Sequence, residues 1–263
     1  MGVDKLFKKL DSRSIHIDPE VSKLTSESVR SHVEEFIGLL DKNSKEEAIQ
    51  AFLETHSYFF NGPLDLYGLS PLYSKIELGS DYVTDFAWFD IHSLGCEWNL
   101  VEIEPPEEPL FNAKGDPSAR LTHAITQVRD WQYWIHQNND FARKLLPNVL
   151  SPMGYIYMGR HAELKVKEKQ EALQHLSYDN RGQFRIYTLD RLASAAIGVA
   201  DRLIGETGGT WYVPMRALTH KDLANGLTGE AKKSMENGHM KKITERSLEE
   251  RISLRASEYL DFG

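Results

Sequence analysis

Apolar residues recur at helical spacing in two segments near the N-terminus, which predicts two helices. The first stripe consists of Val29, Val33, Phe36 and Leu40. The second stripe consists of Ala48, Ile49, Phe52 and Leu53. Ser44 and Glu47 precede the second stripe at the spacing of a capping box, so we expect this helix to begin at Ser44. Asn61-Gly62-Pro63 then ends the helical unit.

A second pattern, rich in β-branched and aromatic residues, predicts strands between residues 72 and 104. Residues 82–89 (YVTDFAWF) and 98–104 (WNLVEIE) are the two arms of an expected hairpin, joined through a turn at residues 93–95. Pro105-Pro106 end the second arm, because neither proline can donate a backbone hydrogen bond to a neighbouring strand.

Helices and strands alternate along the rest of the central region. Asp116-Pro117 is expected to start the clearest helix. Its apolar stripe consists of Leu121, Ala124, Ile125, Val128, Trp131 and Ile135. Strands are predicted at residues 153–158 and 184–187, and helices at residues 163–176 and 192–203. This order predicts an α/β domain with a mixed central sheet over residues 44–204, between an N-terminal extension (1–43) and a C-terminal extension (205–263).

Composition limits the classes of protein that remain. Hydrophobic residues make up 41% of the 263 positions, enough for a sizeable core. The net charge of −8 argues mildly against a protein coated in nucleic acid, although basic residues concentrated along one groove would still bind it. The single cysteine, Cys96, excludes an internal disulfide and a multi-cysteine zinc site. No apolar run approaches a membrane span and the N-terminus lacks a signal-peptide core, so we expect a soluble cytoplasmic protein.

Carboxylates gather at the end of the predicted hairpin. Residues two apart in a strand share a face, so Glu102 and Glu104 lie together, and Asp85 on the partner arm adds a third acid. Such a cluster repels itself unless a cation lies within it, and hard oxygen ligands suit Mg²⁺. A bare E-x-E pattern is also typical of the solvated face of an edge strand, and on spacing alone this second interpretation is the commoner one. Trp98 and Leu100 share the same face, however, which argues against a simple water-facing surface.

The hairpin contains Thr84-Asp85-Phe86 in one arm and Val101-Glu102-Ile103-Glu104-Pro105 in the other. This pair resembles the motif of the PD-(D/E)XK nuclease superfamily, whose members have a mixed central sheet flanked by helices. The resemblance to one branch, the Shedu antiphage-defence nucleases, extends to three further segments. These are residues 47–56 (EAIQAFLETH), 124–131 (AITQVRDW) and 185–192 (RIYTLDRL).

The resemblance implies roles for the matched residues. Asp85 and Glu102 would hold Mg²⁺, or Mn²⁺ in its place, helped by the carbonyl of Ile103. The third motif position is lysine in most of the superfamily, where it orients the attacking water and offsets developing negative charge. Here that position is Glu104, which cannot supply positive charge but can act as a base or as a second metal ligand.

Further candidates surround the hairpin. The resemblance implies that Gln127 contacts the active-site water or a phosphate, whereas helical spacing explains it equally well as a border of the core stripe. Glu47 is either an extra metal ligand or a helix cap, and its capping-box position favours the cap. The candidates for a DNA-binding groove are Lys114, Arg120, Arg129 and Arg160. Each of these four also fits a solvated surface charge.

Two classes of function follow. The leading hypothesis is a Mg²⁺-dependent endonuclease that cleaves double-stranded DNA in bacterial antiphage defence. The alternative is a catalytically degraded module of the same fold that binds DNA or a phage component and acts through assembly. A glycosidase is disfavoured, because Glu102 and Glu104 are side by side on one strand and do not flank a sugar cleft. The resemblance and the apolar stripes of the extensions also predict a homo-oligomer, either a dimer or a tetramer.

Overall fold

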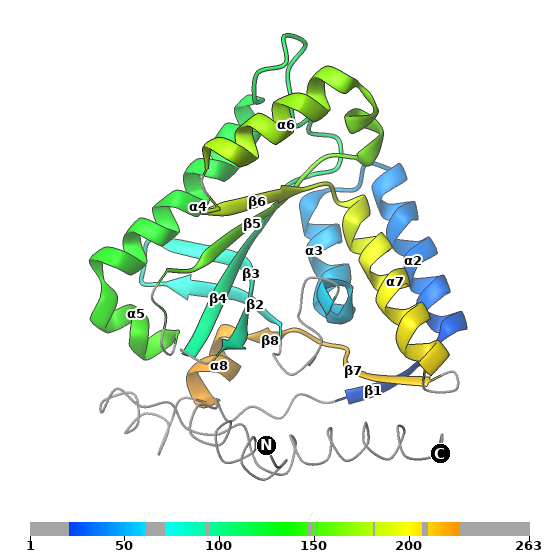
Figure 1. Ribbon diagram of the computed structural model, residues 1–263. Helices are drawn as coiled ribbons and strands as arrows, with labels where there is room; N and C mark the ends of the chain where they lie inside the picture. The colour runs from blue at the N-terminus through cyan, green and yellow to red at the C-terminus, as the bar shows by residue number, and fades with distance from the viewer. Residues whose placement is uncertain are drawn as a thin grey trace, which may run out of the picture.

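The computed structural model describes residues 21–61, 72–92, 95–146, 149, 151–180, 182–206 and 210–226. Its central feature is a mixed sheet of six strands in the order β6-β5-β4-β3-β2-β8 (Figure 1). The strands are β2 (Tyr73–Leu78), β3 (Tyr82–His92), β4 (Gly95–Ile103), β5 (Met153–Tyr157), β6 (Phe184–Tyr187) and β8 (Leu218–Thr219). Strands β2, β3 and β4 pair antiparallel, and β4, β5 and β6 pair parallel. The predicted α/β class with a mixed central sheet is therefore confirmed.

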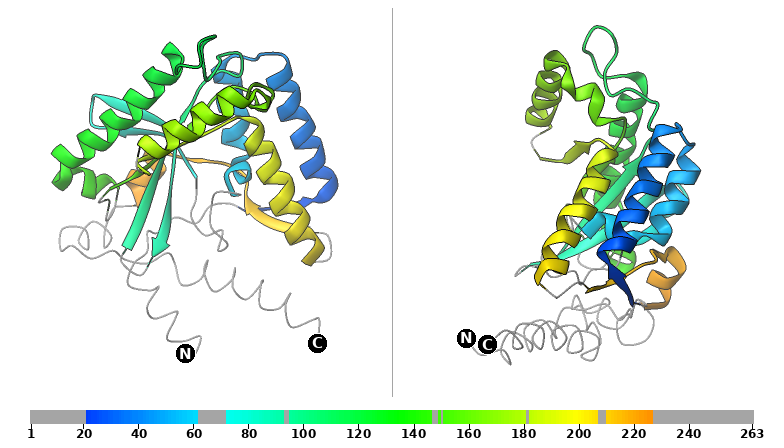
Figure 2. Two further views of the ribbon diagram at one scale, coloured as in Figure 1. Left: turned by 45° about the horizontal axis from the view of Figure 1, so that its top comes forward. Right: turned by 90° about the vertical axis from the view of Figure 1, so that its right-hand side faces the viewer.

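Helices cover both faces of this sheet (Figures 1 and 2). One group consists of α4 (Ala119–Gln137), α5 (Asn139–Leu145) and α6 (Lys167–Asp179). The other consists of α2 (Ser26–Asp41), α3 (Glu46–Thr55) and α7 (Asp190–Glu206). Short helical segments complete the fold at η1 (Ser57–Asn61), η2 (His161–Lys165) and α8 (His220–Gly226). The chain thus has two hydrophobic cores, one beneath each group of helices.

Strand β4 contributes to both cores through the alternation of its side chains. Trp98 and Leu100 pack in the core beneath α4, whereas Val101 and Ile103 pack in the core beneath α2, α3 and α7. The strand lies between β3 and β5, so the interpretation of E-x-E as the exposed face of an edge strand is wrong. The strand that carries the two glutamates therefore has a hydrophobic core on each of its faces.

The predicted helix starts differ from the observed ones by two to four residues. Helix α6 begins at Lys167 and not at residue 163, and α7 begins at Asp190 and not at residue 192. Helix α3 begins at Glu46 with Lys45 as its N-cap, and no Ser44–Glu47 capping box forms. Ser44 instead helps to end α2, because its backbone N–H donates to the carbonyl of Leu39. The α4 helix begins after Ser118, whose side chain accepts a hydrogen bond from the N–H of Leu121. Pro117 lies before the helix, where it bridges to Phe111.

The described parts of both predicted extensions pack against the central domain. The apolar stripe of α2 (Val29, Val33, Phe36 and Leu40) is buried in the core that it shares with α3 and α7. Strand β1 (Val21–Thr25) pairs antiparallel with β7 (Thr210–Pro214) in a separate two-stranded sheet. Because the α2 stripe is covered within a single chain, it no longer supports the expected homo-oligomer, which stays a prediction.

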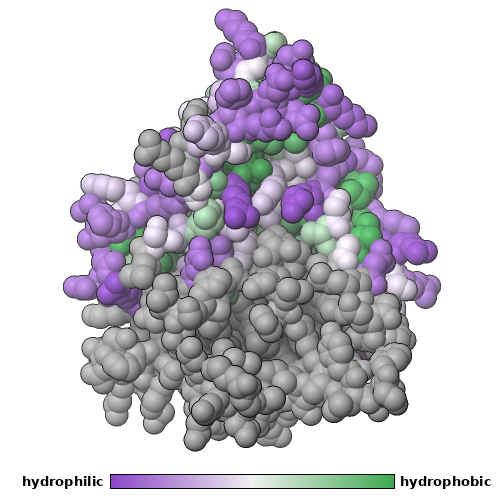
Figure 3. Space-filling model, in the orientation of Figure 1, coloured by the Kyte–Doolittle hydropathy of each residue, from purple (hydrophilic) through white to green (hydrophobic). Residues whose placement is uncertain are grey.

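The surface is mainly polar where it is described. The face shown in Figure 3 is largely hydrophilic, with hydrophobic side chains in small separate patches. The large exposed hydrophobic residues of the described chain are Val83, Tyr133, Val166, Tyr178 and Ile197. They lie on five different parts of the fold (β3, α4, the start of α6, the end of α6, and α7), so they mark no single interface.

Gly154 sets how closely β5 approaches α4. A Cβ atom at this position would lie 2.2 Å from Cγ1 of Val128 and 3.0 Å from Cβ of Phe184. We therefore expect Gly154→Ala to lower the free energy of unfolding by about 1–3 kcal/mol, the scale of overpacking in a core. Gly38→Ala is the matched control: Gly38 is inside α2 with nothing within 4 Å of a Cβ, so alanine there should stabilise by about 0.4–1 kcal/mol. Urea unfolding followed by circular dichroism measures both, and an unchanged midpoint for Gly154→Ala would contradict the described β5–α4 contact.

Candidate functional site

Three charged residues lie in one row across the central sheet. Lys75 on β2 is opposite Asp85 on β3, between the paired positions Ser74–Phe86 and Ile76–Thr84. Asp85 and Glu102 occupy the next position beyond the last β3–β4 pair, which joins Phe86 to Val101. The fold therefore brings the two acids of the sequence motif together across neighbouring strands, as predicted, and adds a lysine that sequence reasoning missed.

Asp85 is held at both carboxylate oxygens. Its Oδ2 accepts a hydrogen bond of 2.7 Å from the backbone N–H of Ile103, and its Oδ1 lies 2.6 Å from the Lys75 ammonium. The residue is 5% exposed, so water solvates it little. In addition, the side-chain amide of Gln50, on α3, donates to the Asp85 carbonyl at 3.4 Å. The neighbouring strands hold the carboxylate, and α3 holds the backbone of the same residue.

Glu102 is buried without an equivalent cation. Burial, and then the negative charges of Asp85, Glu104 and Glu46, raise its pKa to about 10. The side chain is therefore a neutral carboxylic acid at pH 7 in the absence of a metal ion. A raised pKa of this kind means that the cluster has more carboxyl groups than the cations of the chain neutralise.

Glu104 is fully buried just beyond β4, where its backbone N–H donates to the carbonyl of Tyr157. Its Oε2 accepts a charged hydrogen bond from Nε of Arg120, whereas its Oε1 has no partner among the described residues. Burial raises the pKa of Glu104 to about 7 even though Arg120 opposes the rise. One oxygen of this carboxyl group is thus held by Arg120. The other is a buried acceptor without a donor, and such acceptors are rare in native proteins.

A fourth acid, Glu46, comes from the first turn of α3. Its Oε2 lies 3.3 Å from a terminal nitrogen of Arg120, and burial and the charge of Asp85 raise its pKa. Glu47, the residue selected from the sequence, is exposed. Helical spacing contained the signal, because Glu46 precedes the buried residues Ile49 and Gln50 by three and four positions. The sequence favoured a capping role for Glu47 over a metal-ligand role, and that capping box does not form.

The cluster has the donors of a hard-cation site but is closed by side chains of the chain itself. If Glu46, Asp85, Glu102 and Glu104 were all ionised beside Lys75 and Arg120, two negative charges would remain, the charge that one divalent ion neutralises. Within the described residues, however, no three His, Cys, Asp or Glu side chains are arranged to hold a metal ion as they stand. Lys75 and Arg120 instead form ion pairs with Asp85, Glu104 and Glu46. Oxygen donors and the orphan Oε1 of Glu104 fit Mg²⁺ once these contacts open.

The connection from Glu104 to Arg120 is braced by Glu163. Its two carboxylate oxygens accept the backbone N–H groups of Leu110 and Phe111 at 2.9 and 3.0 Å, and Lys169 lies 2.8 Å from Oε1. These contacts tie the segment before α4 to the end of β5, which precedes η2. Glu163 therefore stabilises the segment that positions Arg120 next to the acids.

Three further predicted residues lie on α4 or in the loop that precedes it. Gln127 is half-buried on α4, seven residues after Arg120 and so on a similar flank of the helix. Lys114 is exposed in the loop before α4. Arg129 is exposed on α4 with its guanidinium 5.4 Å from the ring centre of Phe184. Their proposed contacts with water, phosphate or DNA stay predictions.

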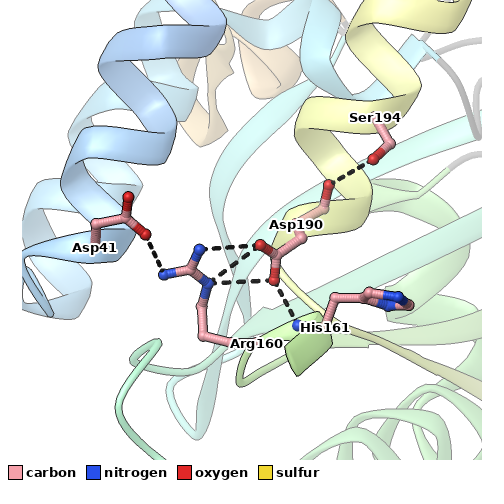
Figure 4. A network of polar contacts seen from close by, with 5 residues as sticks. All are labelled: Asp41, Arg160, His161, Asp190 and Ser194. Carbon is pink, nitrogen blue, oxygen red and sulfur yellow. Dashed lines mark hydrogen bonds and ion pairs between the residues drawn. The ribbon is translucent and has the colours of Figure 1, made fainter. Parts of the chain in front are cut away.

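Arg160 has partners on two helices (Figure 4). Its guanidinium lies within 3.0–3.2 Å of both Asp190 oxygens, at the start of α7, and 2.8 Å from Asp41, at the end of α2. The N–H of His161 also donates to Asp190 at 2.6 Å. Although burial opposes ionisation, hydrogen bonds from Arg160 and His161 lower the pKa of Asp190. In this structure Arg160 joins the end of β5 to α2 and α7, so a contact with DNA would have to compete with this network.

The elevated pKa of Glu102 predicts how stability depends on pH. Because its pKa is higher in the folded than in the unfolded chain, the acid stabilises the fold most below about pH 4.5, and that contribution is lost as pH rises toward the folded value. In buffer with a chelator, Glu102→Gln should match wild type near pH 4.5 and exceed its free energy of unfolding by several kcal/mol at pH 9, because each unit of pKa difference is worth about 1.4 kcal/mol. Chemical unfolding across this range measures the difference. A constant difference between the two proteins would mean that Glu102 is ionised in the folded state.

The comparisons with known proteins assign the chain to a family. The family model for the C-terminal part of the Shedu protein SduA matches residues 43–193, more than half of the chain. No curated protein matches the chain. Among the described residues, no helix has the length and apolar character needed to cross a membrane. The matched range includes Glu46, Lys75, Asp85 and Arg120 together with the E-x-E strand, and the chain belongs to the Shedu family.

Proposed function

We propose that this protein is a metal-dependent DNA endonuclease of antiphage defence. Membership of the Shedu family associates the chain with defence. The observation that carries the nuclease proposal is the buried Oε1 of Glu104, an acceptor without a donor beside a cluster of three other acids. Buried carboxyl groups that repel one another destabilise a fold, and binding of a divalent cation is a function that would explain such a cluster.

The metal ligands in this proposal come from the two central strands. Asp85, Glu102 and the carbonyl of Ile103 would hold Mg²⁺ or Mn²⁺, and Glu46 supplies a further oxygen from α3. A divalent ion bound there offsets negative charge on the phosphate and lowers the pKa of water. Asp85 is already oriented for this role by the N–H of Ile103.

Glu104 is suited to act as the general base. Its pKa of about 7 lies near working pH, which is where a base is most effective. Arg120 holds Oε2, so Oε1 is the atom left to accept a proton. In the proposed step, a water oxygen bonds to phosphorus as the bond to the leaving oxygen breaks. The proton of the water passes to Glu104, and the leaving oxygen takes a proton from solvent.

Double-stranded DNA is the proposed substrate. Among the basic candidates Arg120 has the strongest position, because its side chain is 42% exposed and already touches the site. Its guanidinium can therefore meet a phosphate from the solvent side. Lys114, Arg129 and Arg160 are the remaining candidates for backbone contacts, and the net charge of −8 requires such contacts to be local.

One observation favours a second candidate function. Asp85 is paired with Lys75, and Glu104 and Glu46 with Arg120, so the acids are neutralised in part without a metal ion. A catalytically degraded module that binds DNA or a phage component, and acts through assembly, would need no more than this. Binding of a divalent ion distinguishes the two functions.

The first test removes the metal ligands. Linear and supercoiled DNA are incubated with the full chain in Mg²⁺ or Mn²⁺, and titration calorimetry measures Mn²⁺ binding. We expect Asp85→Ala and Glu102→Ala each to lose Mn²⁺ binding and to lower cleavage by about 10²-fold or more. Asp81→Ala, an exposed acid in the turn between β2 and β3, is the matched control and should behave as wild type. Wild-type cleavage in either ligand variant would refute this site.

The second test concerns the base. Glu104→Gln keeps the shape of the side chain and removes its charge, so cleavage should slow by roughly 10²-fold or more. Glu104→Lys restores the usual superfamily pattern. In an enzyme that depends on two glutamates it should impair cleavage, whereas in a degraded site it would create activity. If Glu104→Gln cleaves DNA at the wild-type rate, this carboxylate is a bystander.

A further inference from the structure

Lys75 is a cation of the site that lies outside the sequence motif. Its ammonium is 2.6 Å from Oδ1 of Asp85, directly across the β2–β3 ladder. The charges of Glu46 and Glu102 also act on it. It therefore belongs to the carboxylate cluster through contact and through electrostatics, although it lies on a different strand from the E-x-E pair.

The backbone of Lys75 has a left-handed conformation, with φ of +51°. In a regular strand, residues three apart face opposite sides, yet Tyr73 and Ile76 both pack in the core beneath α4. The left-handed residue between them interrupts the alternation of side chains, so that both can face the same side of the sheet. Glycine adopts this conformation without strain, whereas lysine does not, so the backbone requirement by itself does not account for a lysine.

We propose that Lys75 supplies, from β2, the catalytic ammonium that the E-x-E motif lacks on β4. The inference rests on the proposed nuclease function and assigns a further residue to it. In the metal-free protein the ammonium pairs with Asp85. In the reaction it contacts the attacking water or a non-bridging phosphate oxygen, and there it offsets the negative charge that develops on the phosphate.

Lys75 fits this role better than Arg120 does. Two nitrogens of Arg120 are bound to Glu104 and Glu46, which fixes its planar group between α3 and the end of β4. An ammonium has three N–H groups, and the bond to Asp85 uses one of them. The side chain of Lys75 is also 49% exposed, so it lies where the cluster meets solvent and where a phosphate would arrive.

The test separates cation removal from loss of the fold. Lys75→Met keeps an unbranched side chain one atom shorter and removes its charge, and Lys75→Arg keeps the charge. Lys167→Met is the matched control, since Lys167 is 81% exposed and pairs with Glu171 on the surface of α6. Each full-length protein is titrated with Mn²⁺ in the absence of DNA, and single-turnover cleavage is measured at saturating Mg²⁺.

The expected result is a change of opposite sign in the two measurements. Lys75→Met should bind Mn²⁺ about 3- to 10-fold more tightly, because a like charge has left the site, and should cleave roughly 10²-fold more slowly. Lys75→Arg should recover cleavage to within about 10-fold of wild type. Lys167→Met should alter neither measurement.

Other outcomes overturn the proposal in distinguishable ways. Cleavage by Lys75→Met at the wild-type rate would make Lys75 a bystander and leave the Asp85–Glu102 site intact. Parallel loss of Mn²⁺ binding and cleavage would show that Lys75 only supports the structure around Asp85. Wild-type protein that neither binds Mn²⁺ nor cleaves DNA would remove the nuclease function itself, and the role of Lys75 with it.

Discussion

The structure depends on the confinement of four carboxyl groups near the end of β4, three of them buried and one half-buried. Water screens charge poorly at such a place, so each negative charge requires a proton, a cation of the chain or a bound ion. Glu102 takes a proton, whereas Asp85 pairs with Lys75, and Glu104 and Glu46 with Arg120. These neutralising groups come from β2 and α4, and the acids come from α3, β3 and the end of β4. The electrostatics of one site therefore join segments that are distant in the sequence.

The rest of the fold keeps these segments in place. The central position of β4 buries the E-x-E pair and prevents it from relaxing into solvent. Glu163 braces the chain between β4 and α4 by accepting two backbone N–H groups. On the other face, Arg160 links β5 to Asp41 and Asp190, at the ends of α2 and α7. The described part of the N-terminal segment is thus integrated with the family-matched region, because α2 supplies both core side chains and one partner of this network.

Local patterns were sufficient to predict strands β2 to β6 and the face of the acids. Strands β1, β7 and β8 were not predicted, and long-range packing decided them. The alternation around Trp98 and Leu100 placed Glu102 and Glu104 correctly, since a period of two is a property of a single strand. The phase of α3 was missed because Ser44 serves the end of α2, a contact that involves a different helix. Lys75 was missed because its position depends on the register between β2 and β3, and because a lysine gives no sign of a left-handed backbone.

The departure of Glu104 from the usual lysine has a different meaning in three dimensions than in the sequence. Read along β4 alone, a positive charge has been replaced by a negative one, which indicates a damaged site. Across the sheet, the same cluster contains an ammonium one strand beyond Asp85 and a guanidinium against Glu104. A phosphate experiences the summed field of these groups, and that field does not depend on which strand carries each charge. This fold therefore combines positive charge with a Glu104 Oε1 that is unpaired among the described residues, the atom proposed as the base, whereas a single motif position could supply only one of the two.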